Sequence, residues 1–333
     1  MGKLSTENLK RLLDCIRNDP TVVVPPLAGF DSGVHTIDDK YLVVSTDPCI
    51  GVPKEWFGWL LIHYAASDVA LFGAKPQYCA INLLGPPTTT PDTFLKIMKQ
   101  ACRAADEIGM SIITGHTGSY QGLTTEIGVC TAYGIMSKDK LITPGKAKPG
   151  DLILCIKPLG LEVAVNFALT KKEIAKEIFG SKRAEELQEF VTMQSCVKEA
   201  LILAKTGYVH AMHDTTEGGL TTALNEMAEA SKLGFRIDFE QIPFCKEALN
   251  LQQRFHLSDE QLLSMSSTGT IVASINPKTD HQIMKTMERN NLTASILGSF
   301  EKTKDRILFK KGKPTCFPSD ADDPYEMILS GKL

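Results

Sequence analysis

Apolar and polar positions follow two different periods along the first third of the chain, which predicts strands and helices in alternation. The β-branched run 41–46 and the run 79–84 predict strands, and the long apolar-periodic stretch 55–72 predicts a helix that a glycine and a proline end. Strands are also expected at 110–114 and 126–136. These elements give the region a βαβαββ-like order.

The helix that begins near residue 90 has signals at both ends. Thr90 suits an N-cap, Pro91 the first helical position and Asp92 the acidic first turn. Apolar residues then recur at positions 94, 98, 101, 105 and 108, which is the spacing of one helix face. Gly109 ends the pattern, so a helix from Thr90 to Gly109 is expected.

The pattern resets in the polar stretch 146–151, which contains a proline and a glycine and predicts a domain boundary. Two domains are expected, residues 1–148 and 149–333. In the second, strands are expected at 152–156, 208–213, 235–239, 270–275 and 294–297, and helices at 161–169, 182–205, 219–232, 246–256 and 279–290. Short connections mixed with helices favour an α+β sandwich over a doubly wound parallel sheet.

The composition is that of a globular protein, with 43% hydrophobic and 23% charged residues in a chain of 333. A net charge of −3 without a dense basic cluster argues against nucleic acid and anionic lipid as partners. The absence of a long apolar run and of a signal peptide predicts a cytoplasmic protein without a membrane span. The nine cysteines form no C-x-x-C pair, so we expect reduced thiols.

Common nucleotide-binding fingerprints are absent. Gly115, Gly118 and Gly122 do not have the G-x-G-x-x-G spacing, and Gly145-Lys146 does not complete a Walker loop. Any phosphate chemistry therefore needs another scaffold.

Several acidic residues stand at strand ends or beside glycines, namely Asp31, Asp47, Asp68, Asp214 and Glu217. Carboxylates that share a cleft repel one another unless a cation lies between them, and Mg²⁺ is the hard cation that prefers oxygen ligands. A single aspartate after a strand is, however, more often a turn or helix-cap residue. Position alone leaves both interpretations open.

The paired glycines Gly218 and Gly219 precede a predicted helix. Backbone N–H groups at such a helix start are suited to a phosphate or a carboxylate. The alternative is an ordinary capped helix, because Thr216 and Glu217 also suit an N-terminus.

The order of these motifs resembles the aminoimidazole ribonucleotide (AIR) synthase superfamily over nearly the whole chain. The resemblance rests on S-T-D ending at Asp47, A-S-D-V-A-L-F-G-A-K-P at 66–76, T-G-H-T at 114–117, P-G-D at 149–151, H-D-T-T-E-G-G-L-T-T-A-L-N-E at 213–226 and S-S-T-G-T at 266–270. The second half looks most like the hydrogenase maturation protein HypE.

The resemblance implies a two-domain PurM-like fold. In that fold the N-terminal domains of a homodimer pair their sheets into a β-barrel, ATP and Mg²⁺ bind beside the barrel, and the C-terminal domain is an α/β sandwich. The shared chemistry is transfer of the ATP γ-phosphate to an acceptor oxygen, which needs chiefly positioning and charge neutralisation.

The resemblance also implies roles for individual residues. The metal ligands would be Asp47, Asp68 and His116; the cofactor-binding residues would be Gly29, Asp31, Gly115, Thr117, Gly218, Gly219 and Asn225; and the catalytic residues would be Asp214 and Glu217.

Two positions depart from the family pattern, because Phe30 and His116 stand where carboxylates are usual. Imidazole suits zinc, copper or nickel better than Mg²⁺. The departures imply weaker ATP binding, another metal or no catalysis. A member that binds a nucleotide or metabolite without turnover is therefore the main alternative. AIR synthase itself is a further one, although its extended T-D-G-V-G-T-K motif is replaced in residues 46–51.

The end of the chain separates it from HypE proper, which carries its substrate on a terminal cysteine. This sequence ends in Ser330-Gly-Lys-Leu333, and its last cysteine is Cys316, where a strand edge or packed turn is expected. The acceptor would therefore be a separate small molecule or a partner protein.

Overall fold

A computed structural model describes residues 6–331 of the chain. The chain forms two compact units, of which the first comprises residues 10–141 and the second residues 142–331 with residues 6–9. The division lies a few residues before the boundary expected from the sequence. Each unit is described separately below.

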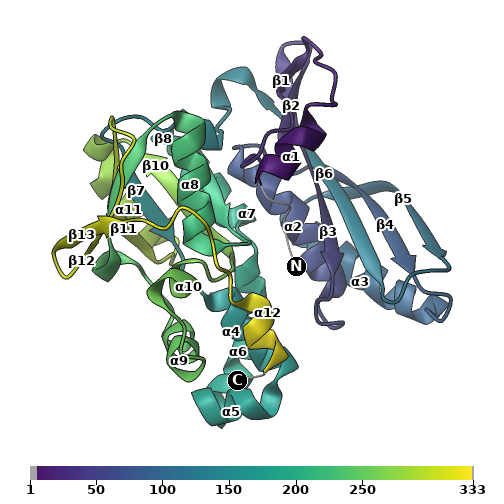
Figure 1. Cartoon of the computed structure of the whole chain (residues 1–333). Helices are drawn as coiled ribbons and strands as arrows, with labels where there is room; N and C mark the ends of the chain where they lie inside the picture. Colours follow the sequence, from purple (N-terminus) through teal and green to yellow (C-terminus); the bar gives the residue numbers. More distant parts are fainter. Residues whose placement is uncertain (1–5, 332–333) are drawn as a thin grey trace. The chain divides into compact units, whose positions relative to one another are not determined.

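The first unit is a mixed six-stranded sheet with two helices on one face (Figure 1). The strand order is β1-β2-β3-β6-β4-β5, in which only β4 and β5 run parallel. The strands are β1 (Val22–Val24), β2 (Gly33–Ile37), β3 (Lys40–Ile50), β4 (Tyr78–Gly85), β5 (Ser111–Ser119) and β6 (Ile127–Ser137). The helices are α2 (Phe57–Leu71) and α3 (Pro91–Ile108), and α1 (Thr6–Leu13) precedes the sheet. Helix α2 packs against β3 and β6 and also against α3, which explains why it is apolar all round.

Both predicted ends of α3 are confirmed. The Thr90 side chain accepts a hydrogen bond from the Thr93 N–H at 3.2 Å, and Gly109 has a left-handed φ of 64° that glycine adopts without strain. The N-cap and the glycine C-cap each act within one helical turn, so the sequence alone predicts them.

Strand β3 is longer than expected. It pairs with β6 without interruption from Lys40 opposite Ser137 to Ile50 opposite Ile127. Asp47 therefore lies inside the strand and not after its end, which corrects the sequence-based expectation. Pairing with a neighbouring strand overrides the low strand propensity of aspartate and proline.

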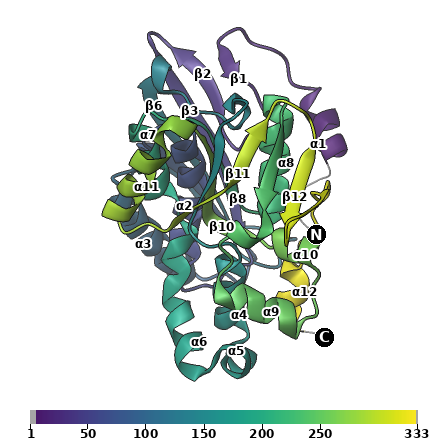
Figure 2. The same ribbon diagram turned by 90° about the vertical axis from the view of Figure 1, so that its left-hand side faces the viewer.

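The second unit has a seven-stranded sheet between two layers of helices. Its strand order is β13-β12-β9-β11-β7-β10-β8. The strands are β7 (Leu152–Ile156), β8 (Val209–Thr215), β9 (Gly234–Asp238), β10 (Ser267–Ile275), β11 (Ala294–Glu301), β12 (Arg306–Lys310) and β13 (Lys313–Cys316). Helix α8 (Gly219–Ser231) covers one face, and α7 (Val197–Lys205) and α11 (Asp280–Arg289) lie on the other (Figure 2). The remaining helices are α4 (Leu161–Thr170), α5 (Lys172–Phe179), α6 (Ser181–Gln188), α9 (Lys246–Arg254), α10 (Asp259–Leu263) and α12 (Tyr325–Ser330).

The single helix predicted over residues 182–205 is wrong, because α6 and α7 are separated by the 3-10 helix η3 (Glu189–Gln194). The buried Lys157 provides the reason. Its Nζ donates to the carbonyls of Met193 and Ser195 at 3.0 and 2.5 Å, and it pairs with Glu199 at 3.1 Å. The ammonium draws the Met193 and Ser195 carbonyls to itself and so holds the turn that separates the two helices.

No helix among residues 6–331 is long and apolar enough to cross a membrane. All nine cysteines are free, as their spacing predicts. Cys316 is exposed on β13, which is an edge strand, so the expected strand edge is confirmed.

Candidate functional site

The predicted acidic residues of the first unit meet around Ser45, a buried serine on β3. The Ser45 Oγ lies 2.7 Å from Asp68 Oδ2 and 2.9 Å from the backbone oxygen of Asp31. Asp47 follows two residues later, and side chains at that spacing on a strand point to the same face about 7 Å apart. The fold thus brings Asp31, Asp47 and Asp68, which are distant in sequence, to one region of the sheet.

The loop 29–32 is held at this place by Phe30. Its ring packs edge-on against Phe72 at the end of α2, with a centroid distance of 6.4 Å. Gly29 takes a φ of 79°, which lets the chain turn into the loop. The phenylalanine that replaces a family carboxylate is therefore an apolar anchor. The neighbouring Ser32 Oγ is buried and finds no hydrogen-bond partner among residues 6–331, so it offers a polar group that sequence reasoning missed.

The groups around Ser45 fit a hard cation. They are carboxylate and hydroxyl oxygens, which are the ligands Mg²⁺ prefers. The nearest thiols are not competing ligands for a soft metal, because burial, with the charge of Asp47 as a smaller cause, raises the pKa of Cys49 to about 12. A hydrogen bond that Cys130 donates to Cys79, with burial as a smaller cause, likewise raises the pKa of Cys130. Both cysteines therefore remain neutral thiols at physiological pH.

His116 lies on β5, at the other edge of the sheet from β1. Asp47 pairs with Cys130, Cys130 with Ile81, and Ile81 with Gly115, so Gly115 shares the face of Asp47 three strands away. His116, one residue on, points to the opposite face. Its exposed ring instead contacts the Tyr120 hydroxyl at 2.5 Å.

This first unit therefore does not bring His116 together with Asp47 and Asp68, and its role as a metal ligand stays a prediction. Gly115 has a structural reason to be glycine, because a Cβ there would lie 2.1 Å from the Ile81 carbonyl oxygen. Thr117 follows on the same exposed strand. Which residues are neighbours depends on the order of the strands and on which face of the sheet each side chain points to, and both are set only when the sheet folds.

In the second unit, Asp214 lies near the end of β8 and is 3% exposed. Its Oδ1 has no hydrogen-bond partner among the described residues. His213 Nδ1 is 3.4 Å away but makes its bond to the Asp214 backbone oxygen at 2.8 Å. Glu217, the other predicted catalytic residue, is exposed in the turn that follows. A buried carboxylate oxygen without a donor is open to a ligand.

The turn Gly218-Gly219 starts α8 with both residues at positive φ, 77° and 56°. A Cβ on Gly219 would lie 2.5 Å from the Met265 carbonyl oxygen, so this position tolerates only glycine. The Gly218 N–H donates to Asp323 Oδ2 at 3.0 Å. The predicted anion position thus holds a carboxylate from the chain's own C-terminal segment.

Asn225 uses its side-chain amide within the chain. Its Nδ2 donates to the carbonyls of Pro318 and Ser319 at 2.8 and 3.2 Å, and its Oδ1 accepts from Arg306 Nη1 at 2.8 Å. The structure gives this residue the task of holding the C-terminal segment, and cofactor binding by Asn225 stays a prediction.

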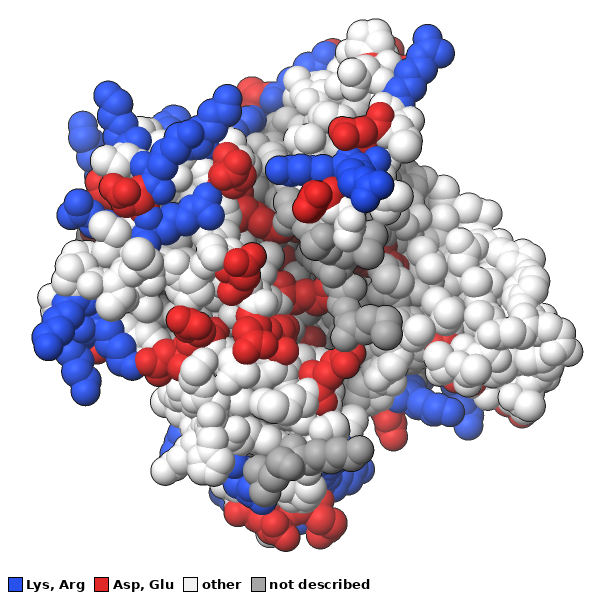
Figure 3. Space-filling view, in the orientation of Figure 1, with Lys and Arg blue, Asp and Glu red and all other residues white. Residues whose placement is uncertain are grey.

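Glu162, in the first turn of α4, is a further acidic group that sequence reasoning missed. Its Oε2 accepts a hydrogen bond from the Thr268 N–H at 2.8 Å. Burial, with the charges of Asp323 and Glu217 as smaller causes, raises the pKa of Glu162 to about 7. Figure 3 shows acidic side chains gathered on the face of this unit where α8 and the C-terminal segment lie in Figure 1.

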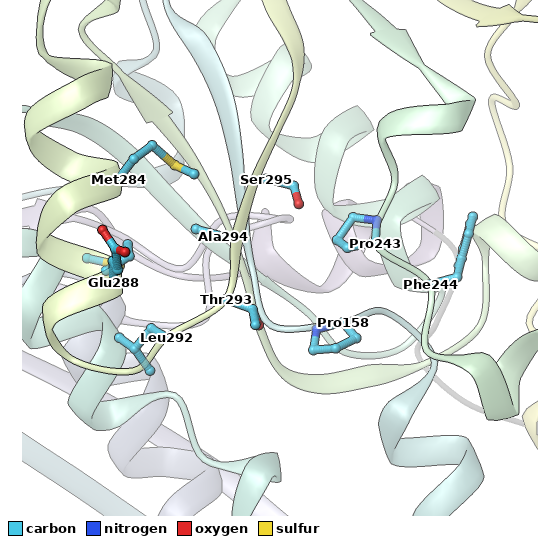
Figure 4. A pocket seen from close by; sticks show the side chains of 10 residues that line it. Pro158, Pro243, Phe244, Met284, Glu288, Leu292, Thr293, Ala294 and Ser295 are labelled. Atoms are coloured by element: carbon cyan, nitrogen blue, oxygen red, sulfur yellow. The ribbon is translucent and has the colours of Figure 1, made fainter.

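A pocket of about 520 Å³ lies elsewhere in the second unit (Figure 4). Met284, Glu288 and Leu292 approach it from one side, and Pro243 and Phe244 from the other. None of the residues predicted from the sequence lines it. The pocket is therefore separate from the candidate site.

Comparison with known proteins gives relatives along the whole chain. A selenide, water dikinase of Carboxydothermus hydrogenoformans is 25% identical over 341 aligned residues, which cover 93% of this chain and 95% of the relative. A carbamoyl dehydratase HypE of Rhizobium leguminosarum bv. viciae is 27% identical over 80% of this chain and 75% of the relative. A crystal structure of HypE in complex with ATP shares the fold, with a TM-score of 0.66 and 18% identity over 95% of this chain and 91% of that one.

Family models match both units. The model of the AIR synthase related protein N-terminal domain matches residues 29–136, and that of the C-terminal domain matches residues 148–311. The two-domain PurM-like α+β fold expected from the sequence is thereby confirmed. The chain belongs to the AIR synthase related family.

Proposed function

We propose that the protein is an ATP-dependent enzyme that transfers the γ-phosphate of ATP to an oxygen of a small acceptor or of a partner protein, with an amide-type oxygen as the favoured acceptor. The observation that carries the proposal is the contact of Ser45 with the Asp68 carboxylate and with the Asp31 backbone, beside Asp47 on the same face of β3. Relatives named as a dikinase and a dehydratase, and a structural neighbour that holds ATP, support it.

In this proposal Asp47 and Asp68 would hold Mg²⁺, which would neutralise phosphate charge when bound. The Ser45 hydroxyl fixes Asp68 by donating to its carboxylate, so that residue keeps one orientation. Asp31 and the buried Ser32 hydroxyl lie in the loop that would face the phosphates. Phosphoryl transfer needs mainly such positioning and charge neutralisation.

The second unit would contribute the acceptor side. Asp214 offers a buried carboxylate oxygen without a donor, which suits a hydrogen-bond donor or a cation on the acceptor. The Gly218 N–H at the start of α8, which donates to Asp323 in this structure, would suit an anionic group of the acceptor only after that bond is exchanged. Glu217, exposed beside this turn, is the second residue proposed to act on the acceptor.

The proposal is tested by calorimetric binding of Mg-ATP to the full chain and by release of ADP. Asp47→Asn and Asp68→Asn keep the side-chain shape and remove the charge. Each should weaken Mg-ATP binding at least about tenfold, because each removes a charge-assisted contact. Asp39→Asn, an exposed aspartate in the β2–β3 turn, is the matched control and should bind normally.

Unchanged affinity in both Asn variants would remove the metal assignment. Tight Mg-ATP binding without any ADP release, tested with hydroxyl- and amide-bearing acceptors, would favour the alternative of a binding protein without turnover. Turnover with the substrate of AIR synthase would instead favour that enzyme.

A homodimer through the first unit is part of the same proposal. One face of its sheet is covered by α2, but the other exposes apolar side chains, including Tyr78 at 40% and Ile135 at 39%. Tyr133 lies beside Tyr78 on this face, with ring centroids 5.6 Å apart. A sheet face that exposes such apolar side chains favours burial against a second copy. Sedimentation equilibrium at micromolar concentration should give the mass of a dimer, and a monomer would rule this assembly out.

A further inference from the structure

The pocket of the second unit exists because strand β9 leaves the sheet early. β9 ends at Asp238 and pairs with β11 only from Gly298 onward, and the chain then turns into the 3-10 helix η4 (Phe239–Gln241). The start of β11, residues 294–296, therefore has β7 on one side and no strand of the described chain on the other. The pocket of about 520 Å³ lies at this open edge, between β11, α11 and the segment 243–244.

Backbone hydrogen bonds hold the walls of the pocket in place. The Leu159 N–H donates to the Pro243 carbonyl at 2.9 Å, and the Cys245 N–H donates to the Leu159 carbonyl at 3.0 Å. On the other wall, the Lys157 N–H donates to the Thr293 carbonyl at 3.0 Å. Both walls are thus fixed to the turn that follows β7. The pocket is formed before any ligand arrives, so that binding costs little ordering of the protein.

Most of the lining of the pocket is apolar. Met284 and Leu292 come from α11 and the turn after it, and Pro243 and Phe244 lie opposite them (Figure 4). The Phe244 ring rests against the Phe239 ring, with a centroid distance of 5.7 Å. A flexible thioether facing an aromatic ring favours an apolar body between them. The volume and this lining are typical of pockets that bind small molecules.

Glu288 and Ser295 are polar groups of the pocket that have no partner within the chain. Glu288 lies one helical turn after Met284, so both side chains share a face of α11. The Glu288 carboxylate and the Ser295 hydroxyl make no hydrogen bond or ion pair with any residue that the structure describes. Glu288 is also the one ionisable side chain among the described residues that line the pocket, because Lys285 and Arg289 are exposed and line no part of it. The pocket therefore presents one negative charge beside apolar walls.

The charge of Glu288 selects among possible occupants. It repels a carboxylate or a phosphate, whereas a protonated amine would form a charge-assisted hydrogen bond with it. We propose that the pocket binds a small apolar molecule that carries a protonated amine, with the apolar body between Met284 and Phe244 and the ammonium group on the Glu288 carboxylate. The Ser295 hydroxyl offers a second hydrogen bond. No residue of the proposed phosphoryl-transfer site lines the pocket, so this site does not depend on that function.

Three probes that share a ring and differ in charge test the proposal, namely naphthylmethylamine, naphthylmethanol and naphthoate. Their binding to the full chain is followed by NMR of isotope-labelled methionine methyl groups, because Met284 and Met287 both line the pocket. The amine should shift the signals of these two methyl groups. It should bind about tenfold more tightly than the alcohol, because it adds one charge-assisted hydrogen bond, and naphthoate should bind most weakly.

Substitutions separate the charge from the apolar walls. Glu288→Gln keeps the side-chain shape and should weaken amine binding about tenfold while leaving alcohol binding unchanged. Glu185→Gln removes the same charge from an exposed position on α6 that lines no part of the pocket, and it should leave both affinities unchanged. Met284→Ala should weaken the amine and the alcohol by the same factor, because it removes an apolar contact and leaves the carboxylate.

The proposal is refuted if the amine and naphthoate bind equally well, or if amine affinity is the same in Glu288→Gln as in the unaltered chain. Shifts confined to methionines outside the pocket would also overturn it. So would the absence of any shift at Met284 and Met287 up to the solubility limit of the amine. Because Glu288 is exposed, its glutamine variant should fold normally, and the test does not depend on the fate of Met284→Ala.

Discussion

The two sheets of the molecule differ in how much of their surface the chain itself covers. In the second unit α8 packs on one face and other helices on the opposite one, so that nearly every residue of β10 is buried. In the first unit α2 covers one face, whereas the other leaves residues such as Ile50 exposed at 52%. The second unit covers both faces of its sheet with its own helices, whereas the open face of the first is suited to a partner.

The buried carboxylates of the two units differ in a similar way. Asp68 of the first unit accepts a hydrogen bond from the Ser45 hydroxyl. Glu162 of the second unit accepts one backbone hydrogen bond, yet burial raises its pKa to about 7. The negative charges of Asp323 and Glu217 also disfavour the ionised form of Glu162. The carboxylate of the first unit is held ready for a cation, and that of the second makes its surroundings sensitive to pH.

A lysine placed in each sheet tests the difference in coverage between them, and the larger loss of stability is expected in the second unit. Val272 is fully buried in β10 between β7 and β8. Val272→Lys should cost more than about 4 kcal/mol, because an unpaired charge enters a dry core. Thermal unfolding followed by circular dichroism would measure it. A melting temperature within a few degrees of the unaltered chain would show that the second sheet is more accessible than described.

The pH dependence of Glu162 gives the next largest effect. Its folded pKa is raised above the unfolded value, so the folded state binds the extra proton between about pH 4.5 and 7, and stability falls as pH rises through this window. Glu162→Gln keeps the acceptor for Thr268 and should remove that fall, with a gain of at most about 3 kcal/mol above pH 7. Urea unfolding at pH 5 and pH 8 would measure it; a parallel pH profile in the variant would contradict the assignment.

Ile135→Lys, on the open face of the first sheet, should affect assembly and not stability, in contrast to Val272→Lys. The substitution should change unfolding free energy by no more than about 0.5 kcal/mol, because the lysine remains in water in the monomer. It should nevertheless halve the mass in sedimentation, because a dimer would bury the charge. Lys138→Ala, at an exposed position after β6, is a control that should remain dimeric. A dimer that survives Ile135→Lys would place the contact elsewhere.

The smallest effect on binding or assembly is expected at Ser45. Ser45→Ala removes the donor to Asp68 and should lower unfolding free energy by about 1 kcal/mol. It should also weaken Mg-ATP binding less than Asp68→Asn does, since it frees the carboxylate without removing it. Chemical denaturation and calorimetry on the same variant would check both parts. A larger loss of ATP affinity than in Asp68→Asn would make the hydroxyl itself a contact.

Local signals in the sequence determined much of the secondary structure. The caps Thr90 and Gly109 bound α3, and the paired glycines 218 and 219 mark the start of α8, because capping and positive φ act over a few neighbouring residues. The ordered motifs were enough to identify the family. The break between α6 and α7 was not readable, since it depends on Lys157, which lies more than thirty residues away from the carbonyls it binds.

The sequence by itself therefore determined the elements, the class of fold and which acidic residues were candidates. Only the tertiary structure decided which candidates meet: Asp68 reaches Ser45 across 23 positions, whereas strand order and face separate His116 from them. It also decided that Asp323 bonds to Gly218, 105 positions earlier. The physical reason is that caps and periodicity are local interactions, whereas shared faces and long-range hydrogen bonds are set by how strands and helices pack.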